Sequence, residues 1–469
     1  MKPIDPAILA ALEQLLSQDD QPLYRGELSG LVEQVLENRG RYLESARRFG
    51  TPQYLFEEPA LQAQIQRFTA AFARKGLVTR AHYAFKANPS LCLVQAIERA
   101  GLAADASSGL ELELALRCGF ARIVLSGPAK TDEELELALR HADRVTVHLD
   151  SFAELERLET LAARSQTTIR AGVRLNTQGH GLWTKFGIPF TALPEFAARA
   201  SHHAHVQLEG VQFHLSWNRQ AGGYLRTLAE LGPVLDQYAP PAGWRFADIG
   251  GGYYPEDDEA AYPWLTRRGR LLSLLGLAPA EGPPPDWNLE YLLHPVQPIE
   301  AMAREIMDAF QAHVPAGLEM WLEPGRYLAN PAVHLLLRVA DVKTPDLAIT
   351  DGGTNLLGWE RLEGEHTPLI NLSQPALVQK PCRVYGSLCT PHDLWGYACY
   401  GEGLKAGDIL MLPAQGAYVQ TLAQRFIKPL CQTIALDLQG ELHQVAPTET
   451  LADRYPQLGD SHKDFGRQR

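Results

Sequence analysis

Residues 81–89 read Ala81-His82-Tyr83-Ala84-Phe85-Lys86-Ala87-Asn88-Pro89, a stretch typical of a buried strand that ends at a lysine. Small and aromatic residues alternate, and Asn-Pro then breaks the pattern. An ammonium group at the end of a buried strand loses water, so it needs a charged partner or a chemical task. Pairing or snorkelling is the ordinary explanation of Lys86. The sharper one is a lysine that forms a Schiff base, because burial and neighbours readily tune its amine.

Similar short β-rich runs recur along the chain, and amphipathic segments separate most of them. The predicted strands are 81–87, 102–107, 122–126, 144–149, 169–175, 208–216, 245–250 and 319–323. A helix pattern at 58–75 precedes the first strand, and the apolar residues of 299–310 fall on one helical face. Eight strands alternating with helices predict an α/β fold of the (β/α)8 barrel type.

The pattern also divides the chain into domains. We expect a helical or mixed lead-in over 1–48, packing partly on the second domain, and then the barrel over 49–328. A Pro- and Gly-containing insertion at 253–295 interrupts the barrel. A β-rich domain over 329–445 and a polar tail over 446–469 follow, and the strands predicted in that domain include 333–343, 347–350, 381–385 and 408–412.

Composition narrows the class of protein. The 469 residues are 45% hydrophobic and 21% charged, as in ordinary soluble globular proteins. A net charge of -12 argues against a nucleic-acid surface. No apolar run reaches about 18 residues, so no membrane span is expected, and the N-terminus lacks the apolar core of a secretory signal. Six cysteines without a C-x-x-C pair favour reduced thiols, a cytoplasmic location and no metal site.

Polar and glycine-rich residues fall at the ends of the predicted strands. In a (β/α)8 barrel the carboxyl ends of the strands meet at one rim, where active sites are built. The residues in question are Lys86, Asp105, Arg174, His214, Gly250–Gly252 and Glu323–Arg326. We therefore predict one site at this rim.

Each candidate has an ordinary explanation beside a chemical one. Gly250–Gly252 can form a turn, or can bring backbone N–H groups close to a phosphate. His214 can be a satisfied core residue, or can stack flat against a pyridine ring. Glu323-Pro324-Gly325-Arg326 can be a turn with a solvated ion pair, or can offer a guanidinium to a phosphate and a carboxylate to a protonated ring nitrogen. With a Schiff-base lysine, these are the parts of a pyridoxal phosphate site.

The β-rich domain contributes three more candidates. Cys389 can be a buried thiol at a turn, or a proton donor held near a carbanion. Tyr418 can give its phenol to a phosphate, or can be an aromatic residue of a loop. Asp351, followed by two glycines, can meet a substrate amine, and a solvated turn is at least as well supported.

The order of these motifs resembles that of the fold-type III pyridoxal-phosphate decarboxylases, which include diaminopimelate and ornithine decarboxylases. The motifs that carry the resemblance, between about residues 50 and 435, are Tyr83–Asn88, Asp105 with Ser107-Ser108-Gly109 and Glu111, Lys185–Ile188, Phe213-His214, Asp248–Gly252, Glu323–Arg326, Cys389 with Asp393, and Gly416–Tyr418. It implies an alanine-racemase-like barrel with a C-terminal β-sandwich or β-barrel domain, and a head-to-tail homodimer with shared active sites.

The resemblance also implies a role for each residue. Lys86 would hold pyridoxal 5'-phosphate as a Schiff base, His214 would lie over the ring, and Glu323 would keep the ring nitrogen protonated. Cys389 of the partner subunit would return a proton to the carbanion. The remaining cofactor contacts would be Asp105, Ser216, Gly250, Gly251, Gly252, Gly325, Arg326 and Tyr418.

Two positions depart from the family pattern. Thr390 stands where diaminopimelate and ornithine decarboxylases have an acidic residue that meets the distal amine. Trp359 stands near a carboxylate-binding arginine of the diaminopimelate enzymes. Both changes favour a substrate without the second charged centre, or a larger conjugated one. The Leu388–Asp393 run resembles members that act on carrier-linked or modified amino acids in siderophore and natural-product pathways. The predicted substrate contacts are Arg174, Asp351, Thr390 and Asp393.

Three hypotheses follow. The first is a decarboxylase of an L-amino acid or amino-acid conjugate, acting through a quinonoid carbanion that Cys389 protonates; a diaminopimelate- or ornithine-type decarboxylase of a free amino acid is its variant. The second is a racemase or epimerase on the same barrel, which Glu323 disfavours because racemases of this fold place an arginine against the ring nitrogen. The third is a catalytically silent barrel that binds a cofactor or a partner. In each case neither nucleic acid nor membrane is an expected partner.

Overall fold

The computed structural model describes residues 6–7, 10, 24–26, 28–177, 182–238, 243–256, 260–262, 264, 271, 291–293, 295–357 and 367–456. The chain divides into two compact units. The first, called here the barrel unit, comprises Ala60–Glu256 and Pro295–Pro331. The second, called the β unit, comprises Met1–Pro59, Asp257–His294 and Ala332–Arg469.

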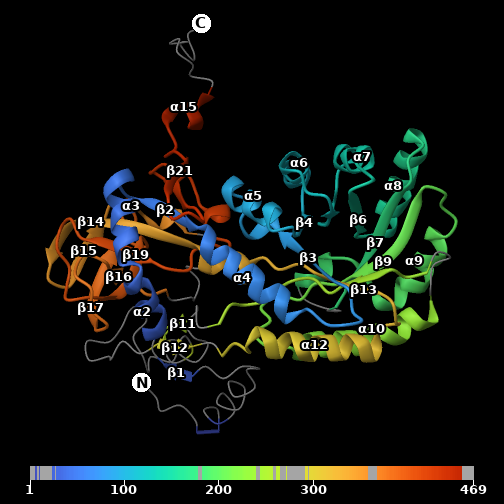
Figure 1. Cartoon of the computed structure of the whole chain (residues 1–469), viewed down its shortest axis with the longest axis horizontal. Helices are drawn as coiled ribbons and strands as arrows, with labels where there is room; N and C mark the ends of the chain where they lie inside the picture. Colours follow the sequence, from blue (N-terminus) through green and yellow to red (C-terminus); the bar gives the residue numbers. More distant parts are fainter. Residues whose placement is uncertain are drawn as a thin grey trace, which may run out of the picture. The chain divides into compact units, whose positions relative to one another are not determined.

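Within the described residues, the barrel unit contains a closed ring of eight parallel strands (Figure 1). The last strand pairs with the first, and a short strand β8 (Ile188–Pro189) adds to β7 outside the ring. The ring runs in the order β3 (Thr79–Ala84), β4 (Ala103–Ala106), β5 (Ile123–Leu125), β6 (Val145–Leu149), β7 (Ile169–Asn176), β9 (Val206–Gln212), β10 (Phe246–Asp248) and β13 (Glu319–Leu322). The (β/α)8 prediction is confirmed.

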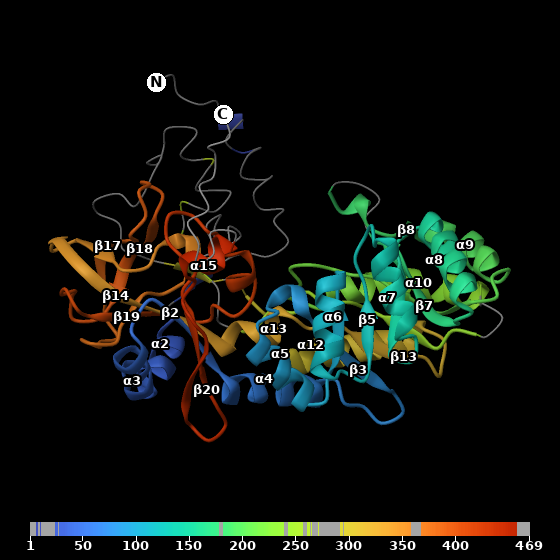
Figure 2. The ribbon, with the colours of Figure 1, turned by 90° about the horizontal axis from the view of Figure 1, so that it is seen from above.

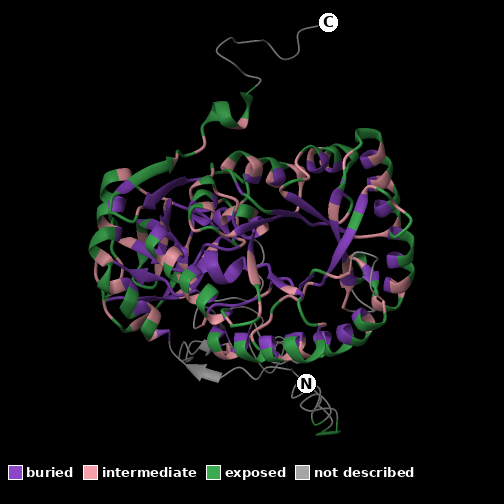
Figure 3. Ribbon diagram, turned by 45° about the vertical axis from the view of Figure 1, so that its right-hand side comes forward, coloured by how far each residue is buried: buried purple, intermediate pink, exposed green. Residues whose placement is uncertain are grey.

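Helices connect these strands and turn their buried faces inward (Figure 3). Several begin at a serine or threonine that accepts a hydrogen bond from the backbone three residues on, as Ser108, Thr131 and Ser151 do. Such caps start a helix directly after a strand. The helices are α4 (Glu58–Ala71), α5 (Leu91–Arg99), α6 (Gly109–Cys118), α7 (Asp132–Arg140), α8 (Phe152–Ser165), α9 (Leu193–Ala200), α10 (Gly222–Gln237), α12 (Ile299–His313) and α13 (Arg326–Ala329).

An aromatic layer fills the barrel interior. The rings of Phe246 and Trp321 stack with centroids 3.7 Å apart and planes 1° from parallel. Glycines make the room: a Cβ on Gly210 would lie 2.3 Å from the Phe246 ring, and one on Gly172 would lie 2.9 Å from His148. Any larger residue at these two strand positions would collide with the layer.

The β unit holds a mixed sheet of nine strands among the residues described (Figure 2). Its strand β14 pairs with both β19 and β15, so six of the strands close into a small barrel. The predicted second β-rich domain is thereby confirmed. The sheet order is β15 (Leu347–Thr350), β17 (Gln379–Tyr385), β18 (Leu394–Tyr400), β16 (Ile370–Asn371), β19 (Ile409–Leu412), β14 (Val333–Thr344), β2 (Gln53–Glu57), β20 (Gln432–Leu436) and β21 (Leu442–Ala446).

The unit boundaries differ from the predicted ones in two places. Strand β2 pairs with β14 and β20, although a barrel beginning at residue 49 would include it. Its apolar residues indicate a sheet but cannot say which sheet. The described residues between 257 and 294, within the predicted insertion, group with the β unit. There Tyr262 and Trp264 stack 4.3 Å apart in one core with the helices α2 (Ser29–Glu37) and α3 (Arg39–Phe49) of the lead-in. Much of this insertion lies outside the described residues.

Candidate active site

Lys86 lies in a 3-10 turn (Phe85–Ala87) that directly follows β3. Its Nζ is 3.4 Å from Oδ2 of Asp105 on β4. The lysine side chain is 34% exposed, whereas the aspartate is fully buried and accepts a second hydrogen bond from Oγ of Ser126 at 2.5 Å. Burial and the nearby charge of Glu323 raise the pKa of Asp105, which Lys86 opposes. The amine is thus reachable from solvent and held by a buried partner.

Glu323 follows β13 and is buried at the same rim. Its Oε1 accepts a hydrogen bond from Nε2 of Gln212 at 3.1 Å, and its Oε2 lies 3.2 Å from Nδ1 of His214. Burial alone would raise the pKa of Glu323, but the hydrogen bond from His214 and the charge of Lys86 hold it below its ordinary value. The anion therefore persists at neutral pH.

His214 is a neutral imidazole that orients Glu323. Burial, and then the positive charge of Lys86, lowers the pKa of His214 to about 4. Nδ1 of His214 lies 3.2 Å from both Oε2 of Glu323 and N of Gly251. Because one nitrogen of a neutral imidazole either donates or accepts, it donates to Glu323 in one tautomer and accepts from Gly251 in the other. Arg174 on β7 adds a further positive charge that lowers this pKa, and its guanidinium lies 4.2 Å from the centre of the Phe186 ring.

The glycine triplet follows β10 and joins neighbouring strand ends. Gly250 and Gly252 have φ angles of 71° and 100°, which favour glycine. A Cβ on Gly251 would lie 2.2 Å from the carbonyl oxygen of Glu323. The backbone N of Gly251 lies 3.2 Å from Nδ1 of His214. Only glycine allows the backbone to approach this closely at the rim.

The remaining rim residues surround this group. Arg326 begins α13 and is buried, with its guanidinium 4.9 Å from the centre of the Tyr254 ring. A Cβ on Gly325 would lie 2.9 Å from Cβ of Ala87, so the Glu323–Arg326 turn packs against the lysine turn. Ser216 is partly buried, two residues after His214.

The predicted β-unit residues form their own cluster. Cys389 is exposed in the loop of residues 386–393 between β17 and β18. The buried carboxylate of Asp393 holds that loop: it accepts hydrogen bonds from N and Oγ1 of Thr354 at 2.7 and 2.9 Å, and from N of Leu388 at 2.6 Å. Thr390, beside the cysteine, is partly buried. Substrate contacts of Asp393 and Thr390 stay predictions.

Asp351 is likewise engaged inside the β unit. Its carboxylate accepts hydrogen bonds from Oγ1 of Thr51 at 2.6 Å and from N of Arg338 at 2.9 Å. Tyr418, predicted to contact phosphate, is partly buried and has a φ of 58°. Trp359 lies outside the described residues. The roles of Asp351 and Tyr418 remain predictions.

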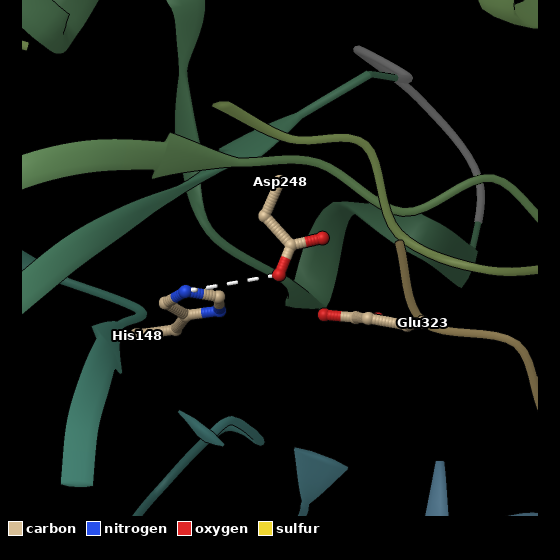
Figure 4. A group of neighbouring side chains, drawn as sticks. All are labelled: His148, Asp248 and Glu323. Atoms are coloured by element: carbon tan, nitrogen blue, oxygen red, sulfur yellow. Dashed lines mark ion pairs between the residues drawn. The ribbon is translucent and has the colours of Figure 1, made fainter. Parts of the chain in front are cut away.

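The sequence interpretation assigned no role to His148 or Asp248, which lie beside the predicted Glu323. His148, Asp248 and Glu323 come from three different strand ends and point toward one another (Figure 4). Among the residues described, they form the one group of histidine and acid side chains with metal-ligand spacing, their ligand atoms lying within 4.8 Å of one another. The sequence did contain a signal for both residues. Asp248 precedes Gly250 by two residues, and residues two apart in a strand lie on the same face. His148 lies near the end of a predicted strand.

A family model described as pyridoxal-dependent decarboxylase, pyridoxal binding domain, matches residues 59–330. The chain belongs to the pyridoxal-dependent decarboxylases. Its cofactor is pyridoxal 5'-phosphate and its reaction class is that of a carboxy-lyase. The fold-type III resemblance is confirmed by this match.

Curated relatives of this decarboxylase are similar over most of their length. Diaminopimelate decarboxylase of Bacillus subtilis is 26% identical over 437 residues, covering 87% of this chain and 91% of that protein. The Pseudomonas aeruginosa enzyme of the same name is 27% identical over 439 residues, covering 87% and 93%. Both alignments span the barrel and the β unit.

Solved structures support the same fold. Diaminopimelate decarboxylase of Helicobacter pylori, complexed with L-lysine, has a TM-score of 0.71 at 22% identity and covers 89% of this chain and 98% of that one. Lysine/ornithine decarboxylase of Vibrio vulnificus, complexed with putrescine, has a TM-score of 0.66 at 21% identity and covers 86% and 98%. At these identities the likeness supports the fold alone.

The charges of the rim residues of this decarboxylase complement the charges of its cofactor. Asp105, Asp248 and Glu323 are buried carboxyl groups that share the rim with the ammonium of Lys86. Such a cluster has an excess of negative charge that a protonated pyridine ring would offset. The crowded glycines and the buried guanidinium of Arg326 fit an anionic phosphate.

Proposed function

We propose that this pyridoxal-dependent enzyme decarboxylates an L-amino acid or an amino-acid conjugate, with Lys86 as the covalent anchor of the cofactor. One observation carries the proposal. Lys86, Asp105, His214 and Glu323 are linked at one rim of the barrel by contacts of 3.4 Å or less or by mutual charge effects. A lysine and an anionic carboxylate that share a rim can flank one ring.

The chain's own residues would divide the work as follows. When bound, the cofactor delocalises the electron pair that remains as carbon dioxide leaves Cα. Glu323, held as an anion by Gln212 and His214, would keep a proton on the ring nitrogen. His214 would face the ring. Phosphate would be held by Ser216, Gly250, Gly251, Gly252, Gly325, Arg326 and Tyr418, and Asp105 would orient the amine of Lys86.

Cys389 supports a shared site in a homodimer. Its thiol is exposed, and Asp393 fixes the loop that carries it. We propose that Cys389 of the partner subunit delivers the proton to Cα after decarboxylation. We also propose a cytoplasmic location, supported by six free cysteines, all within the described residues. No helix in the described part of the chain has both the length and the apolar character needed to cross a membrane.

The substrate class rests on the residues that depart from the family pattern. Thr390 offers no charge to a distal amine, which supports a substrate lacking a second charged centre or a conjugated one. Diaminopimelate is the second candidate, because the curated relatives carry that activity in their names. A racemase is disfavoured by the carboxylate at position 323, which strengthens the electron sink.

A carbon dioxide release screen tests the proposal. The native enzyme, loaded with pyridoxal phosphate, is assayed with diaminopimelate, with free basic, acidic and aromatic amino acids, and with conjugated amino acids. Release from a conjugated or singly charged substrate supports the proposal, and efficient release from diaminopimelate alone would replace it by the second candidate. Exchange of Cα hydrogen in deuterated water without carbon dioxide release would indicate a racemase and contradict both.

A further inference from the structure

Three carboxyl groups are buried at the rim. Asp105, Asp248 and Glu323 are each at most 2% exposed; Lys86 pairs with Asp105, and Arg326 is buried in the turn that follows Glu323. Burial disfavours the ionised form of a carboxyl group that has few cations or hydrogen-bond donors beside it. The carboxyl group with the fewest such partners is therefore the one expected to retain a proton.

Nearby histidines are neutral, and nearby cations have other partners. Burial lowers the pKa of His82 to about 4 and that of His148 to about 3, so both are neutral at neutral pH. Lys130 is paired with Glu154 at 3.2 Å. Arg174 faces the ring of Phe186.

Hydrogen bonding identifies the carboxyl group that keeps the proton. Glu323 accepts from Gln212 and His214, and Asp105 accepts from Ser126 and pairs with Lys86. Asp248 accepts one backbone hydrogen bond, from N of Gly250 to Oδ1 at 2.9 Å. Its Oδ2 has no hydrogen-bond partner among the described residues. The fewest donors therefore stabilise an anion at Asp248.

Asp248 and Glu323 lie close enough for a proton to join them. The two side chains point toward each other, in a group whose ligand atoms all lie within 4.8 Å of one another (Figure 4). Burial, and then the charge of Glu323, raises the pKa of Asp248. Two carboxylates can only accept, so they attract only when one carries the hydrogen. Nε2 of His148 lies 3.9 Å from Oδ2 of Asp248, too far to take the proton in this arrangement.

We propose that Asp248 is a protonated carboxylic acid that donates a hydrogen bond to Glu323 and thereby positions Glu323 as the anion at the cofactor's ring nitrogen. This inference rests on the proposed function only for the ring-nitrogen contact; the proton on Asp248 is a property of the chain itself. His148 closes the other side of Asp248, fixed between Gly172 and a stacked Phe246 ring 5.9 Å away.

A metal ion held by His148, Asp248 and Glu323 is the rival arrangement. Tetrahedral zinc with nitrogen and oxygen ligands at about 2.0–2.1 Å sets its ligand atoms about 3.3 Å apart. The group here spreads up to 4.8 Å, and Glu323 already accepts two hydrogen bonds. The spacing favours a shared proton over an ion.

Two substitutions, Asp248→Asn and Asp248→Leu, distinguish whether Asp248 acts as a proton donor or as an anion. Asparagine keeps an acceptor for Gly250 and offers a permanent N–H donor to Glu323, whereas leucine removes both. In holoenzyme loaded with pyridoxal phosphate labelled with 15N in the ring, we expect the ring-nitrogen chemical shift of a protonated pyridine in the native and Asn proteins. The Leu protein should shift toward the unprotonated form and bind the cofactor about tenfold or more weakly.

Infrared difference spectra of native protein against Asp248→Asn test the proton directly, even if the leucine variant fails to fold. We expect the native protein to contain one additional protonated-carboxyl C=O band that shifts in deuterated water. Asp408→Asn is the matched control, because Oδ2 of that buried aspartate accepts three N–H hydrogen bonds, from Asn371, Gln374 and Lys405, and its replacement should remove no such band.

Three results would overturn the proposal: no carboxyl band lost with Asp248→Asn, a ring nitrogen that loses its proton in the Asn protein as in the Leu protein, or a stoichiometric metal ion that is present in native protein and absent from Asp248→Asn. Failure of the proposed function looks different. Native protein would then bind no pyridoxal phosphate, while the infrared comparison on the same sample would still report on Asp248.

Discussion

Nζ of Lys86, at the end of β3, lies 3.4 Å from Oδ2 of Asp105 on the neighbouring strand β4. The two strands pair in parallel with Ala84 opposite Asp105, so their register brings the two side chains to the same rim. The lysine is partly exposed and the aspartate is buried. Strand pairing therefore places the turn that carries Lys86 beside Asp105.

The first prediction concerns this pair. Asp105→Asn keeps an acceptor for Ser126 but removes the charge opposite Lys86. We expect the rate of covalent loading with pyridoxal phosphate to fall about tenfold, as for the loss of a hydrogen bond to a charged group. Stopped-flow absorbance measures this rate. Ser126→Ala removes one hydrogen bond and keeps the charge, so it should slow loading less. Equal rates in Asp105→Asn and native protein would refute the pairing role.

Glu323→Gln tests the electron sink. Glutamine keeps the shape but offers no anion to a protonated ring nitrogen, so we expect kcat to fall about 100-fold or more while the cofactor still binds. Gln212→Ala removes one of the hydrogen bonds to Glu323 and should cost less in steady-state assays. A kcat within about threefold of native for Glu323→Gln would contradict the assignment.

Cys389→Ala separates cofactor binding from protonation of the product. The thiol lies in the β unit on a loop held by Asp393, so its loss should leave cofactor absorbance unchanged. We expect slower product formation and abnormal products from the unprotonated carbanion, detected by mass spectrometry. Asp393→Asn, which weakens the loop's anchors, should show the same defect in milder form. An unaltered product profile for Cys389→Ala would rule out the cysteine as proton donor.

The buried histidines make the apoprotein sensitive to acid. Burial lowers the pKa of His82 and of His214 to about 4, from an ordinary value near 6.5. Between these values the unfolded chain binds more protons than the native chain, so stability falls as pH falls. Each histidine contributes about 2 kcal/mol of this loss by pH 5. Asp105, whose pKa is raised to about 6, acts in the opposite direction over part of the same range.

Urea unfolding of native apoprotein and His82→Phe measures this effect. Phenylalanine preserves ring packing against Trp321, 4.7 Å away in the native protein, and cannot bind a proton. The variant's free energy of unfolding should therefore decline less between pH 7 and pH 5. Parallel pH profiles for the two proteins would show that His82 does not titrate with folding.

Gly251→Ala tests the crowded strand ends. The added Cβ would lie 2.2 Å from the carbonyl oxygen of Glu323, so the backbone must shift, and we expect a loss of about 1–3 kcal/mol in the free energy of unfolding together with weaker cofactor binding. Gly222→Ala is the control, because its Cβ would meet only a flexible arginine atom at 3.5 Å. Similar unfolding curves for both variants would contradict the packing argument.

The barrel strands could be predicted because each is a short apolar run that ends in a polar or glycine residue at the rim. That regularity placed Lys86, His214 and Glu323 together before any coordinates. The same reasoning did not identify the assignment of β2 to the second sheet, since its pairing with β14 and β20 depends on contacts far away in the sequence. Residue pattern specifies a strand but not its neighbours.

The grouping of His148 and Asp248 with Glu323 was not predicted, because both residues look like core positions of their strands. In the sequence, Asp248 stands two residues before a glycine triplet, and only the closed ring shows that its carboxyl group points toward Glu323 (Figure 4). The engagement of Asp351 with Thr51, about 300 positions away in the chain, is invisible to spacing arguments for the same reason.

Reduction of the loaded native enzyme with borohydride, followed by peptide mass spectrometry, tests the central claim most directly. The reduced cofactor should be fixed to the peptide that contains Lys86, and the Lys86→Ala protein should carry no fixed cofactor. Fixation at any other lysine of the native enzyme, or none at all, would contradict the assignment of the site to this rim of the barrel.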